Sequence, residues 1–525
     1  GTIIGKSAQI NVGSLYVSNK KLVNISSFDG SNISKLTASD QPATGAELMS
    51  LGNIMANKIT FDGNRIVLDT ERVETYAGNK LQPENIVIKT TNEAEVVLGY
   101  AAYDEQHGYA GKNDGTALAT VNVKGTSKKL TKKDGYMWIK DAVQLQAVDT
   151  NLSGKYALHN SIDATATDKW NGGKGFKPIG VDGRGEAKAN GAKYGFTGIL
   201  DGLDNAVFGL TINRADVNNV GLFGVAQDAA VKNITLVGGS IKGSSNVGSV
   251  IGTAVGGTTV SNMLNSTGVS GKKNIGGIIG FTGDFTADNK IITANGVFKD
   301  LVNTGIINSS GGVYDATDKN AASNVGGLIG FFEKGSLTGD SYNMGSVTGT
   351  LHNVGGLVGY AVGSTIGNKD SKEGILNNQL NVIGKYNVGG IVGLAEDVIV
   401  QNVSNAGNVK AIGTVKDEYK YHTDYRKHGE VTLSVDAANV GGIAGNANDA
   451  VISGVLNTGD ISSSKAADHD YYDAGNVGGV VGKAINTNIM DALNKESDIC
   501  GAHNVGGIAG CFGARDGAQA RFAIN

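Results

Sequence analysis

One glycine-rich phrase recurs along this chain, and it constrains the fold more than any other feature. Residues 353–361 read NVGGLVGYA, and near-copies read NIGGIIGFT at 274–282 and NVGGIVGLA at 387–395. A phosphate-binding loop occurs once, between a strand and a helix, so this many copies exclude that interpretation. The phrase is instead an architectural repeat. Its nine copies begin at Asn219, Asn246, Asn274, Asn324, Asn353, Asn387, Asn439, Asn476 and Asn504.

The spacing of the copies sets the size of one structural unit. Successive copies start 27, 28, 50, 29, 34, 52, 37 and 28 residues apart, and the short spacings cluster near 28. Each unit also carries a second strand pattern that ends in an Asn-x-Gly turn, as in VNTG at 302–305. A unit of this size cannot bury its apolar side alone, so the units must stack on one another.

Composition agrees with a stack of short strands. The 525 residues include 80 Gly and 3 Pro, and 40% of them are apolar, without the third-residue glycine period of collagen. Outside the repeats, Ile59/Phe61 and Ile66/Leu68 alternate with polar residues, which indicates short strands. We therefore predict an all-β fold, a right-handed parallel β-helix (solenoid) with loop insertions, whose hand follows the general preference for right-handed crossovers.

The phrase itself contains two kinds of special residue. The paired glycines, such as Gly355 and Gly356, permit either close approach of two backbones or a positive φ, while Val354 and Val358 share one face. In a stacked β coil the same position recurs directly above itself about every 4.8 Å. The leading Asn, such as Asn353, is therefore interpreted either as one member of a hydrogen-bonded ladder or as a turn residue with a local Asx bond.

The chain divides into four segments by pattern. Residues 73–136 keep strand patterns at 86–89 and 96–100, but a polar stretch and the Lys-rich run GTSKKLTKKDG indicate an irregular excursion or linker. Trp138, Val143 and Leu145 predict one short helix. The predicted segments are a β-helix domain at 1–72, the excursion at 73–136, a lead-in at 137–212 and the repeat β-helix at 213–525.

Charge and hydropathy exclude two classes of partner. The formal net charge is −4 and no basic face is evident, which argues against nucleic acid. No apolar run approaches the roughly 18 residues of a membrane-spanning helix, so we predict no membrane insertion. The sequence begins in mid-strand pattern at Gly1, without Met or a signal peptide, and is interpreted as a fragment or processed form.

No catalytic residue, metal site or cofactor is predicted. The seven His form no His-Glu-x-x-His motif, and Cys500 has only His503 nearby, without an orienting third group. Cys500 and Cys511 are either a disulfide, which implies an oxidising compartment, or two unpaired thiols. The closest acidic clusters are interpreted as solvated loop acids; they are Asp163 with Asp168, Asp182 with Glu186, and Asp468 with Asp470 and Asp473.

Three enlarged units carry their extra residues after the Asn-x-Gly strand, at 309–323, 413–438 and 462–475. Insertions at one unit position should project from one corner of a solenoid. Exposed tyrosine offers broad apolar contact with a polar tip, so we predict that this corner binds a glycan or protein. The alternative is that the tyrosines pack back on the coil. The candidate ligand-binding residues are Tyr314, Tyr419, Tyr421, Tyr425, His422, Arg426, Tyr471 and Tyr472, with His428 beside them.

Three segments resemble one class of bacterial protein. The repeated NVGGLVGYA with its Asn-x-Gly strand resembles the GLUG repeat of secreted bacterial surface proteins. GKYALHNSIDATATDKWNGGKGFKPIG at 154–180 resembles the segment that precedes those repeats in large adhesins. GTIIGKSAQINVGSLYVSN at 1–19 and AELMSLGNIMANKITFDGNRIVLD at 46–69 resemble the distal secretion domain of filamentous-haemagglutinin-type proteins. The Asn-Pro-Asn signatures of that domain are absent from this sequence.

The resemblance implies a secreted adhesin of the two-partner-secretion type at the bacterial cell surface. Its implied partners are a host, matrix or bacterial glycan or protein and an outer-membrane exporter. Metallopeptidases that attack immunoglobulin A carry the same repeats, but their His-Glu-x-x-His helix is absent here. Two alternatives stay open: a carbohydrate-active β-helix enzyme, which needs acids projecting together into a groove, and a pure spacer whose binding domain lies elsewhere.

Overall fold

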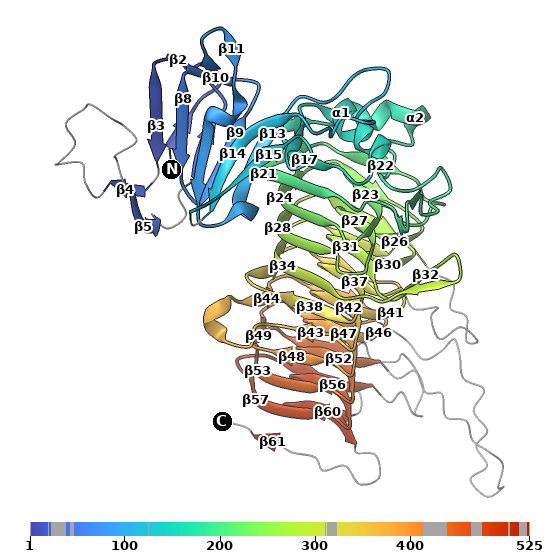
Figure 1. The fold of residues 1–525 in the computed structure, drawn as a ribbon. Coiled ribbons are helices and arrows are strands. Elements are labelled where there is room, and N and C mark those ends of the chain that lie inside the picture. The colour runs from blue at the N-terminus through green and yellow to red at the C-terminus, as the bar shows by residue number, and fades with distance from the viewer. Residues whose placement is uncertain are drawn as a thin grey trace, which may run out of the picture. The chain divides into compact units, whose positions relative to one another are not determined.

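The structure is a computed structural model that describes most of the chain in two compact units, residues 1–159 (unit 1) and 160–525 (unit 2). The described residues are 2–18, 20–22, 38–42, 47–123, 125–309, 311, 323–412, 438–463, 475–501, 504–513 and 522–523. In both units short strands pair in parallel with strands one coil further along the chain (Figure 1), so the predicted parallel β-helix with loop insertions is confirmed.

Unit 1 winds its strands into three main parallel sheets. The first contains β1 (Thr2–Ile4), β6 (Glu47–Ser50), β9 (Arg65–Asp69), β13 (Val96–Tyr100), β16 (Tyr136–Ile139) and β17 (Lys155–Leu158). The second contains β2 (Gln9–Asn11), β7 (Asn53–Ala56) and β10 (Val73–Ala77), with β11 (Lys80–Leu81) antiparallel at its edge. The third contains β3 (Ser14–Ser18), β8 (Lys58–Asp62), β12 (Ile86–Thr90) and β14 (Ala117–Val123), with β15 (Thr126–Thr131) antiparallel.

Residues 73–100 of the predicted excursion contribute regular coil strands to unit 1, whereas residues 101–116 contain turns and no named strand. β10 pairs with β7, β12 with β8 and β13 with β9, all in parallel. The Lys-rich run contributes β15, whose outer residues are exposed while Leu130 is buried. Lys128 and Lys129 are exposed, as expected for an edge strand with one solvated face. The strands expected at 86–89 and 96–100 are confirmed as β12 and β13.

The predicted short helix forms after the last of these coils. It is α1 (Ala142–Ala147), with Asp141 as N-cap, and its buried residues include Leu145. The side-chain Oδ1 of Asp141 accepts the Gln144 N–H at 2.8 Å, which satisfies an otherwise free helix donor. Trp138 was expected in the helix but lies in strand β16, where its indole is buried.

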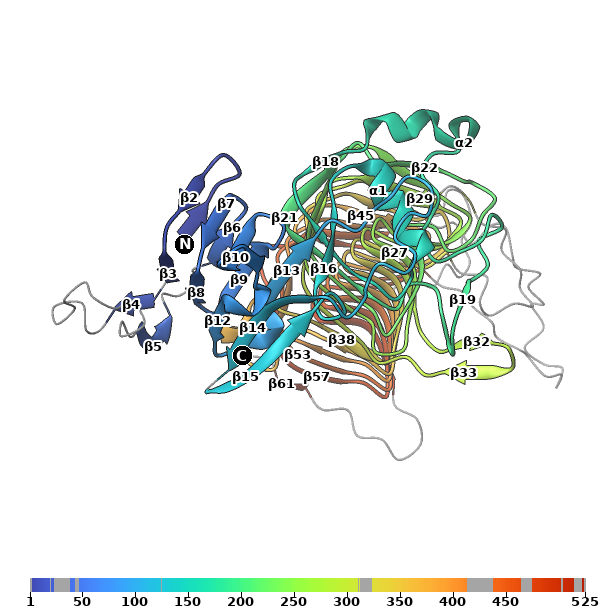
Figure 2. The same ribbon diagram turned by 45° about the horizontal axis from the view of Figure 1, so that its top comes forward.

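Unit 2 begins with short elements, then repeats one coil of four sheets. The opening elements are β18 (Ile162–Asp163), η6 (Thr165–Lys169), α2 (Trp170–Gly173), β19 (Ala189–Asn190) and β20 (Lys193–Tyr194). The unit begins at Asn160, within the segment at 137–212 that was predicted to lead into the repeats. Each coil then passes through sheet 1, sheet 2, sheet 3 and sheet 4 in turn. Figure 2 shows the successive coils lying over one another.

Sheets 1 and 2 are built from the glycine-rich phrase. Sheet 1 contains β26 (Ser245–Val247), β30 (Lys273–Gly276), β36 (Val325–Gly326), β41 (His352–Gly355), β46 (Tyr386–Gly389), β51 (Asn439–Gly441), β55 (Asn476–Gly478) and β59 (Asn504–Gly506). Sheet 2 contains β23 (Phe223–Gln227), β27 (Ile251–Val255), β31 (Ile279–Thr282), β37 (Ile329–Glu333), β42 (Val358–Val362), β47 (Val392–Glu396), β52 (Ala444–Asn448), β56 (Val481–Ile485) and β60 (Ala509–Gly513).

Sheets 3 and 4 are built from the Asn-x-Gly half of the repeat. In unit 2, sheet 3 contains β21 (Ile199–Phe208), β24 (Ala230–Val237), β28 (Thr259–Asn265), β34 (Gly296–Asn303), β38 (Gly335–Thr338), β39 (Ser341–Asn343), β43 (Thr365–Ile366), β44 (Leu376–Asn378), β48 (Ile399–Gln401), β49 (Val403–Asn405), β53 (Val451–Asn457), β57 (Asn488–Asn494) and β61 (Phe522–Ala523). Sheet 4 contains β22 (Thr211–Asn213), β25 (Ser240–Lys242), β29 (Gly268–Gly271), β35 (Ile307–Ser309), β40 (Val347–Thr348), β45 (Val382–Gly384), β50 (Val409–Ala411), β54 (Ile461–Ser463) and β58 (Ile499–Cys500).

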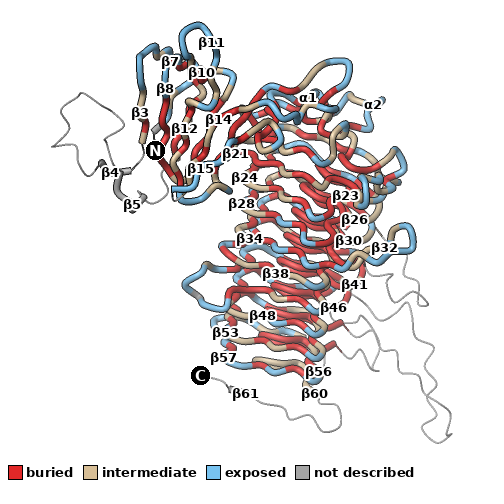
Figure 3. Tube along the Cα trace, viewed as in Figure 1, coloured by how far each residue is buried: buried red, intermediate tan, exposed pale blue. Residues whose placement is uncertain are grey.

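The core of unit 2 is a continuous apolar column inside the coils. In one coil, Val354, Val358, Ile366, Leu376 and Val382 are all fully buried, one or more from each sheet. Figure 3 shows the same buried positions recurring from coil to coil. Because each aliphatic side chain packs on its equivalent above and below, the hydrophobic effect stabilises the stack rather than any single coil.

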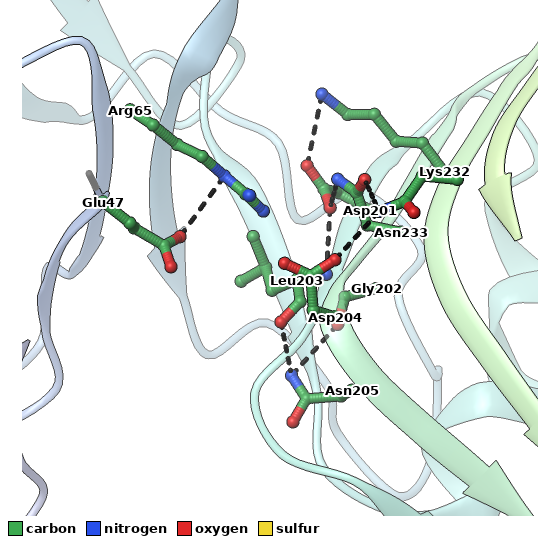
Figure 4. Close-up of polar contacts among 10 residues, drawn as sticks. Glu47, Arg65, Asp201, Gly202, Leu203, Asp204, Asn205, Lys232 and Asn233 are labelled. Carbon is green, nitrogen blue, oxygen red and sulfur yellow. Dashed lines mark hydrogen bonds and ion pairs between the residues drawn. The ribbon is translucent and has the colours of Figure 1, made fainter. Parts of the chain in front are cut away.

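Sheet 3 bends where one residue adopts a left-handed conformation. Asn233 and Asn262 occupy this position in two coils, with φ of 59° and 51°. Asp201 anchors the first bend: its Oδ1 accepts the Leu203 N–H at 2.9 Å and Asn233 Nδ2 at 2.8 Å (Figure 4). Its Oδ2 lies 3.3 Å from Lys232 Nζ, so this buried carboxylate is neutralised as well as hydrogen-bonded.

Candidate functional site

The leading asparagines form a continuous hydrogen-bonded ladder along sheet 1. Asn353 Nδ2 donates to Asn324 Oδ1 at 2.9 Å, and Asn387 Nδ2 donates to Asn353 Oδ1 at 2.9 Å. Of the two interpretations of these asparagines, the ladder is confirmed; Asn324, Asn353 and Asn387 also have a positive φ, for example 60° at Asn353. The ladder joins Asn219, Asn246, Asn274, Asn324, Asn353, Asn387, Asn439, Asn476 and Asn504.

A second asparagine ladder, not predicted from the sequence, lies at the end of sheet 3. Asn378 accepts from Asn343 Nδ2 at 2.8 Å and donates to Asn405 Oδ1 at 2.8 Å and to the Leu380 carbonyl at 2.8 Å. These amides donate to the following coil, whereas the first ladder donates to the preceding one. The members are Asn265, Asn303, Asn343, Asn378, Asn405, Asn457 and Asn494.

The glycines of the phrase are required by close backbone contact and not by positive φ. A β-carbon on Gly355 would lie 1.9 Å from the Val358 carbonyl oxygen, and one on Gly356 would lie 2.0 Å from the Gly390 carbonyl oxygen. A β-carbon on Gly359 would lie 2.5 Å from the Val325 amide nitrogen in the preceding coil. The recurring phrase therefore lets sheets 1 and 2 pack with their backbones in contact.

The insertions leave and rejoin the coil at one corner, between sheet 4 and sheet 1. Ala411, which precedes the insertion at 413–437, pairs with Gly384 of the preceding coil and Ser463 of the next. On the other side, Asn439 pairs with Asn476. The described ends of the predicted insertions thus occupy equivalent positions, as expected, and we call this place the insertion corner. The ladder passes it without interruption.

The candidate ligand-binding side chains lie outside the described residues. They are Tyr314, Tyr419, Tyr421, Tyr425, His422, Arg426, Tyr471 and Tyr472. Their role as ligand-binding residues therefore remains a prediction.

The first enlarged unit differs from the prediction that all its extra residues lie at one corner. Part of its length forms an antiparallel hairpin, β32 (Phe285–Ala287) with β33 (Lys290–Ile292), between sheets 2 and 3. Asp284 anchors the hairpin, because its Oδ1 accepts the Ala294 N–H at 2.9 Å and its Oδ2 lies 2.6 Å from Lys334 Nζ. The spacing of 50 residues could not reveal how the insertion is divided.

Coils that carry no insertion show which described side chains lie at the insertion corner. His352 and Tyr386 pair across β41 and β46, with ring centroids 4.6 Å apart. Lys385 Nζ lies 5.8 Å from the Tyr386 ring centroid, within cation–π distance. The corner therefore combines aromatic and cationic groups on described residues that the sequence reasoning had not singled out.

The outer face of sheet 2 carries an in-register aromatic column. Phe281 and Phe331 stack with centroids 5.0 Å apart, and Phe331 meets Tyr360 edge-on at 5.1 Å. The Tyr360 hydroxyl donates to Glu396, and burial followed by this hydrogen bond raises the Tyr360 pKa. The rings pack mainly on one another, so this column stabilises the coil surface.

The two cysteines are free thiols in different sheets. Cys500 ends β58 in sheet 4 and is exposed, whereas Cys511 lies in β60 of sheet 2 and is half-buried. Cys511 pairs with Lys483 and Cys500 with Ser462. The disulfide alternative is not formed, because the chain turns through sheet 1 between the two residues; two unpaired thiols are what the structure contains.

The acidic clusters that are described serve turns. Asp163 accepts the Thr165 N–H at 2.9 Å, and Asp182 accepts the Arg184 N–H at 2.8 Å and the Glu186 N–H at 3.0 Å. Hydrogen bonds lower the pKa of both carboxyls, beginning with the Thr165 hydroxyl for Asp163 and the Glu186 N–H for Asp182. The cluster at 468–473 lies outside the described residues.

Asp69 is a titratable group of unit 1 that is buried among polar partners. Asp69 lies 3.3 Å from His159 Nε2 and 3.3 Å from Trp138 Nε1, and Arg72 Nε approaches it at 3.4 Å. Burial raises the Asp69 pKa, but hydrogen bonds from His159 and Trp138 outweigh it, so the pKa lies below its ordinary value. The cluster ties β9 to β16 and the end of β17, which is a structural role.

Among the described residues, no group of three or more His, Cys, Asp or Glu side chains is placed to hold a metal ion. Within the same residues, no helix is long and apolar enough to cross a membrane.

Comparisons with known proteins find partial relatives. No protein-family model matches the chain. Halomucin of Haloquadratum walsbyi (strain DSM 16790 / HBSQ001) is 33% identical over 162 residues, which cover 30% of this chain and 2% of halomucin. An immunoglobulin A1 protease of Streptococcus sanguinis is 27% identical over 275 residues, which cover 47% of this chain and 13% of that protein. The chain thus spans a small part of the length of these relatives.

One solved structure is also similar in part. It is a Bacteroides ovatus protein assigned as an immunoglobulin A1 protease, with a TM-score of 0.38, 13% sequence identity and coverage of 69% of this chain and 84% of that one. The parallel β-helix of the present chain follows from its own strand pairing.

Proposed function

We propose that this chain is an elongated, ligand-presenting segment of a secreted bacterial surface protein, an adhesin of the filamentous-haemagglutinin type with GLUG repeats. The observation that carries the proposal is the common departure point of the enlarged units at the insertion corner, beside an uninterrupted asparagine ladder. A scaffold that tolerates long insertions at one corner presents them together, which is how rigid solenoids carry variable binding loops.

The partner is a host, matrix or bacterial glycan or protein, and the contacts are made by the tyrosines and basic residues of the insertions. Tyrosine-rich loops suit this role because they supply contact area at low entropic cost. Export through an outer-membrane partner belongs to the same proposal and is supported by the sequence resemblance alone.

We propose no enzymatic role for this segment. The relative named as an immunoglobulin A1 protease matches over 13% of its own length, and the present sequence contains no His-Glu-x-x-His motif. Among the described acids, Asp163 and Asp182 are engaged in turns, which argues against the carbohydrate-active alternative. A groove with two facing carboxylates would be required for that chemistry.

A matched deletion tests the proposal. Removing residues 413–437 joins Ile412 to Ala438 and reproduces the spacing of the natural short coil from Gly384 to Asn387. We expect the intact chain to bind a component of a glycan and host-matrix array and the deleted chain to lose it with unchanged β circular dichroism. Binding by neither form would favour a pure spacer, and equal binding by both would place the site away from this insertion.

A further inference from the structure

Over six successive coils, the described residues of sheet 4 and the insertion corner carry positive charge without negative charge. Five lysines lie there: Lys242, Lys272, Lys273, Lys385 and Lys410. The six successive segments from sheet 4 to the next leading Asn contain no Asp or Glu in their described residues; they are 240–245, 268–273, 305–309, 345–352, 380–386 and 407–412. The chain as a whole is acidic, with a net charge of −4, so this distribution is a local feature.

These lysines are not neutralised by described carboxylates. Elsewhere in unit 2 lysines pair with acids, as Lys193 does with Asp228 at 2.9 Å and Lys334 with Asp284 at 2.6 Å. None of the five forms an ion pair within the described residues, and Lys385 instead lies over the Tyr386 ring. Unpaired ammonium groups on one face produce a positive potential that extends about a Debye length, roughly 8 Å at physiological salt.

The lysines follow the axis of the coil stack. Lys242 and Lys410 share one outward column of sheet 4, which passes through Ser270, Asn308, Thr348 and Ile383. Five coil steps separate the two lysines, or about 24 Å at about 4.8 Å per step. Lys273 occupies the column of sheet 1 that also contains His352 and Tyr386. Three polar side chains and one aliphatic side chain thus separate the two ammonium groups of the sheet 4 column.

We infer that this strip, defined by the five lysines, binds a linear anionic polysaccharide lying along the coil axis at the base of the insertions. Ammonium groups at intervals match carboxylate or sulfate groups along such a polymer, and Ser270, Asn308 and Thr348 offer hydrogen bonds to its hydroxyls. The strip ends where Asp460 and Asp498 occupy the entrance to sheet 4 in later coils. The inference rests on the proposed function and names the ligand class for it.

Nucleic acid is disfavoured as the polyanion. Base recognition needs exposed aromatic platforms, and Tyr386 is almost fully buried beneath Lys385.

The test uses the full chain and sodium polygalacturonate as the probe. We expect binding that weakens with added salt, no binding of neutral dextran, and a loss of about tenfold or more in the triple variant Lys272→Glu/Lys273→Glu/Lys385→Glu. A matched variant, Lys290→Glu/Lys299→Glu/Lys483→Glu, changes the net charge equally on other faces of unit 2 and should bind normally. Should the Glu variant lose its β circular dichroism, the corresponding Gln triple variant replaces it.

Each other outcome overturns the inference. Equal losses in both triple variants would mean that net charge alone attracts the polymer, and equal binding of double-stranded DNA would mean a generic polyanion surface. Absence of polygalacturonate binding, with array binding that still depends on residues 413–437, would reject the anionic polysaccharide and retain the adhesin. Absence of both activities would reject the two proposals together.

Discussion

Replacing Asn378 by Ala tests how much the second asparagine ladder stabilises the stack. The substitution removes three side-chain hydrogen bonds, to Asn343, Asn405 and the Leu380 carbonyl, each 2.8 Å long. At about 1 kcal/mol net per bond, the expected loss is about 3 kcal/mol, because the amide partners left behind are buried. Gln379→Ala is the matched control, since this amide is exposed and should change stability by no more than about 0.5 kcal/mol.

Hydrogen exchange measured by mass spectrometry is the suitable assay, because a solenoid can open locally without unfolding as a whole. Asn378→Ala should accelerate exchange of amides in β39, β44 and β49 relative to the coils of unit 1. A change no larger than that of Gln379→Ala would refute the conclusion that the buried ladder stabilises neighbouring coils.

Four further perturbations have expected outcomes. Gly356→Ala should destabilise the coil by about 1–3 kcal/mol in a denaturation series, since its β-carbon would lie 2.0 Å from a carbonyl oxygen, whereas Gly257→Ala, whose nearest atom is at 3.6 Å, should be tolerated. The lowered pKa of Asp69 means that its contribution is present above its unfolded pKa, about 3.9, and is lost as pH falls through its lower folded pKa; Asp69→Asn should remove that acid dependence from the melting of unit 1, and an unchanged pH profile would contradict it. Native protein should react with a thiol reagent at Cys500 faster than at Cys511, and two unreactive cysteines would indicate a disulfide. Deleting residues 413–437 should leave the melting temperature of unit 2 within a few degrees, and a large fall would show that the insertion supports the coil.

Most of the fold could be predicted from the repeated glycine-rich phrase. Its nine-fold recurrence and unit length predicted stacked parallel coils. A ladder was one of two interpretations of Asn353, because an identical residue at an identical coil position must lie on itself. The second ladder could have been found in the same way, since Asn303, Asn343 and Asn405 all precede an x-Gly pair. That pattern was interpreted only as a turn.

Other features depended on contacts that a sequence does not display. Gly356 is required because its backbone lies close to the Gly390 carbonyl of the next coil, and not because of a positive φ. The sequence alone does not distinguish these two reasons. The hairpin β32–β33 was hidden inside a long spacing, because spacing gives the size of an insertion and not its corner. The unpaired lysines became visible only when residues more than a hundred positions apart, such as Lys242 and Lys410, were placed in one column.

The most direct test of the account is to locate the bound ligand by hydrogen exchange, using the intact chain and the array component that it captures. We predict that ligand binding slows hydrogen exchange in peptides from the insertions and from the residues beside them at 349–352 and 384–386. Exchange on the outer face of sheet 2 should change little. Protection centred on Phe281, Phe331 and Tyr360 instead would contradict the insertion corner as the ligand-binding side of this protein.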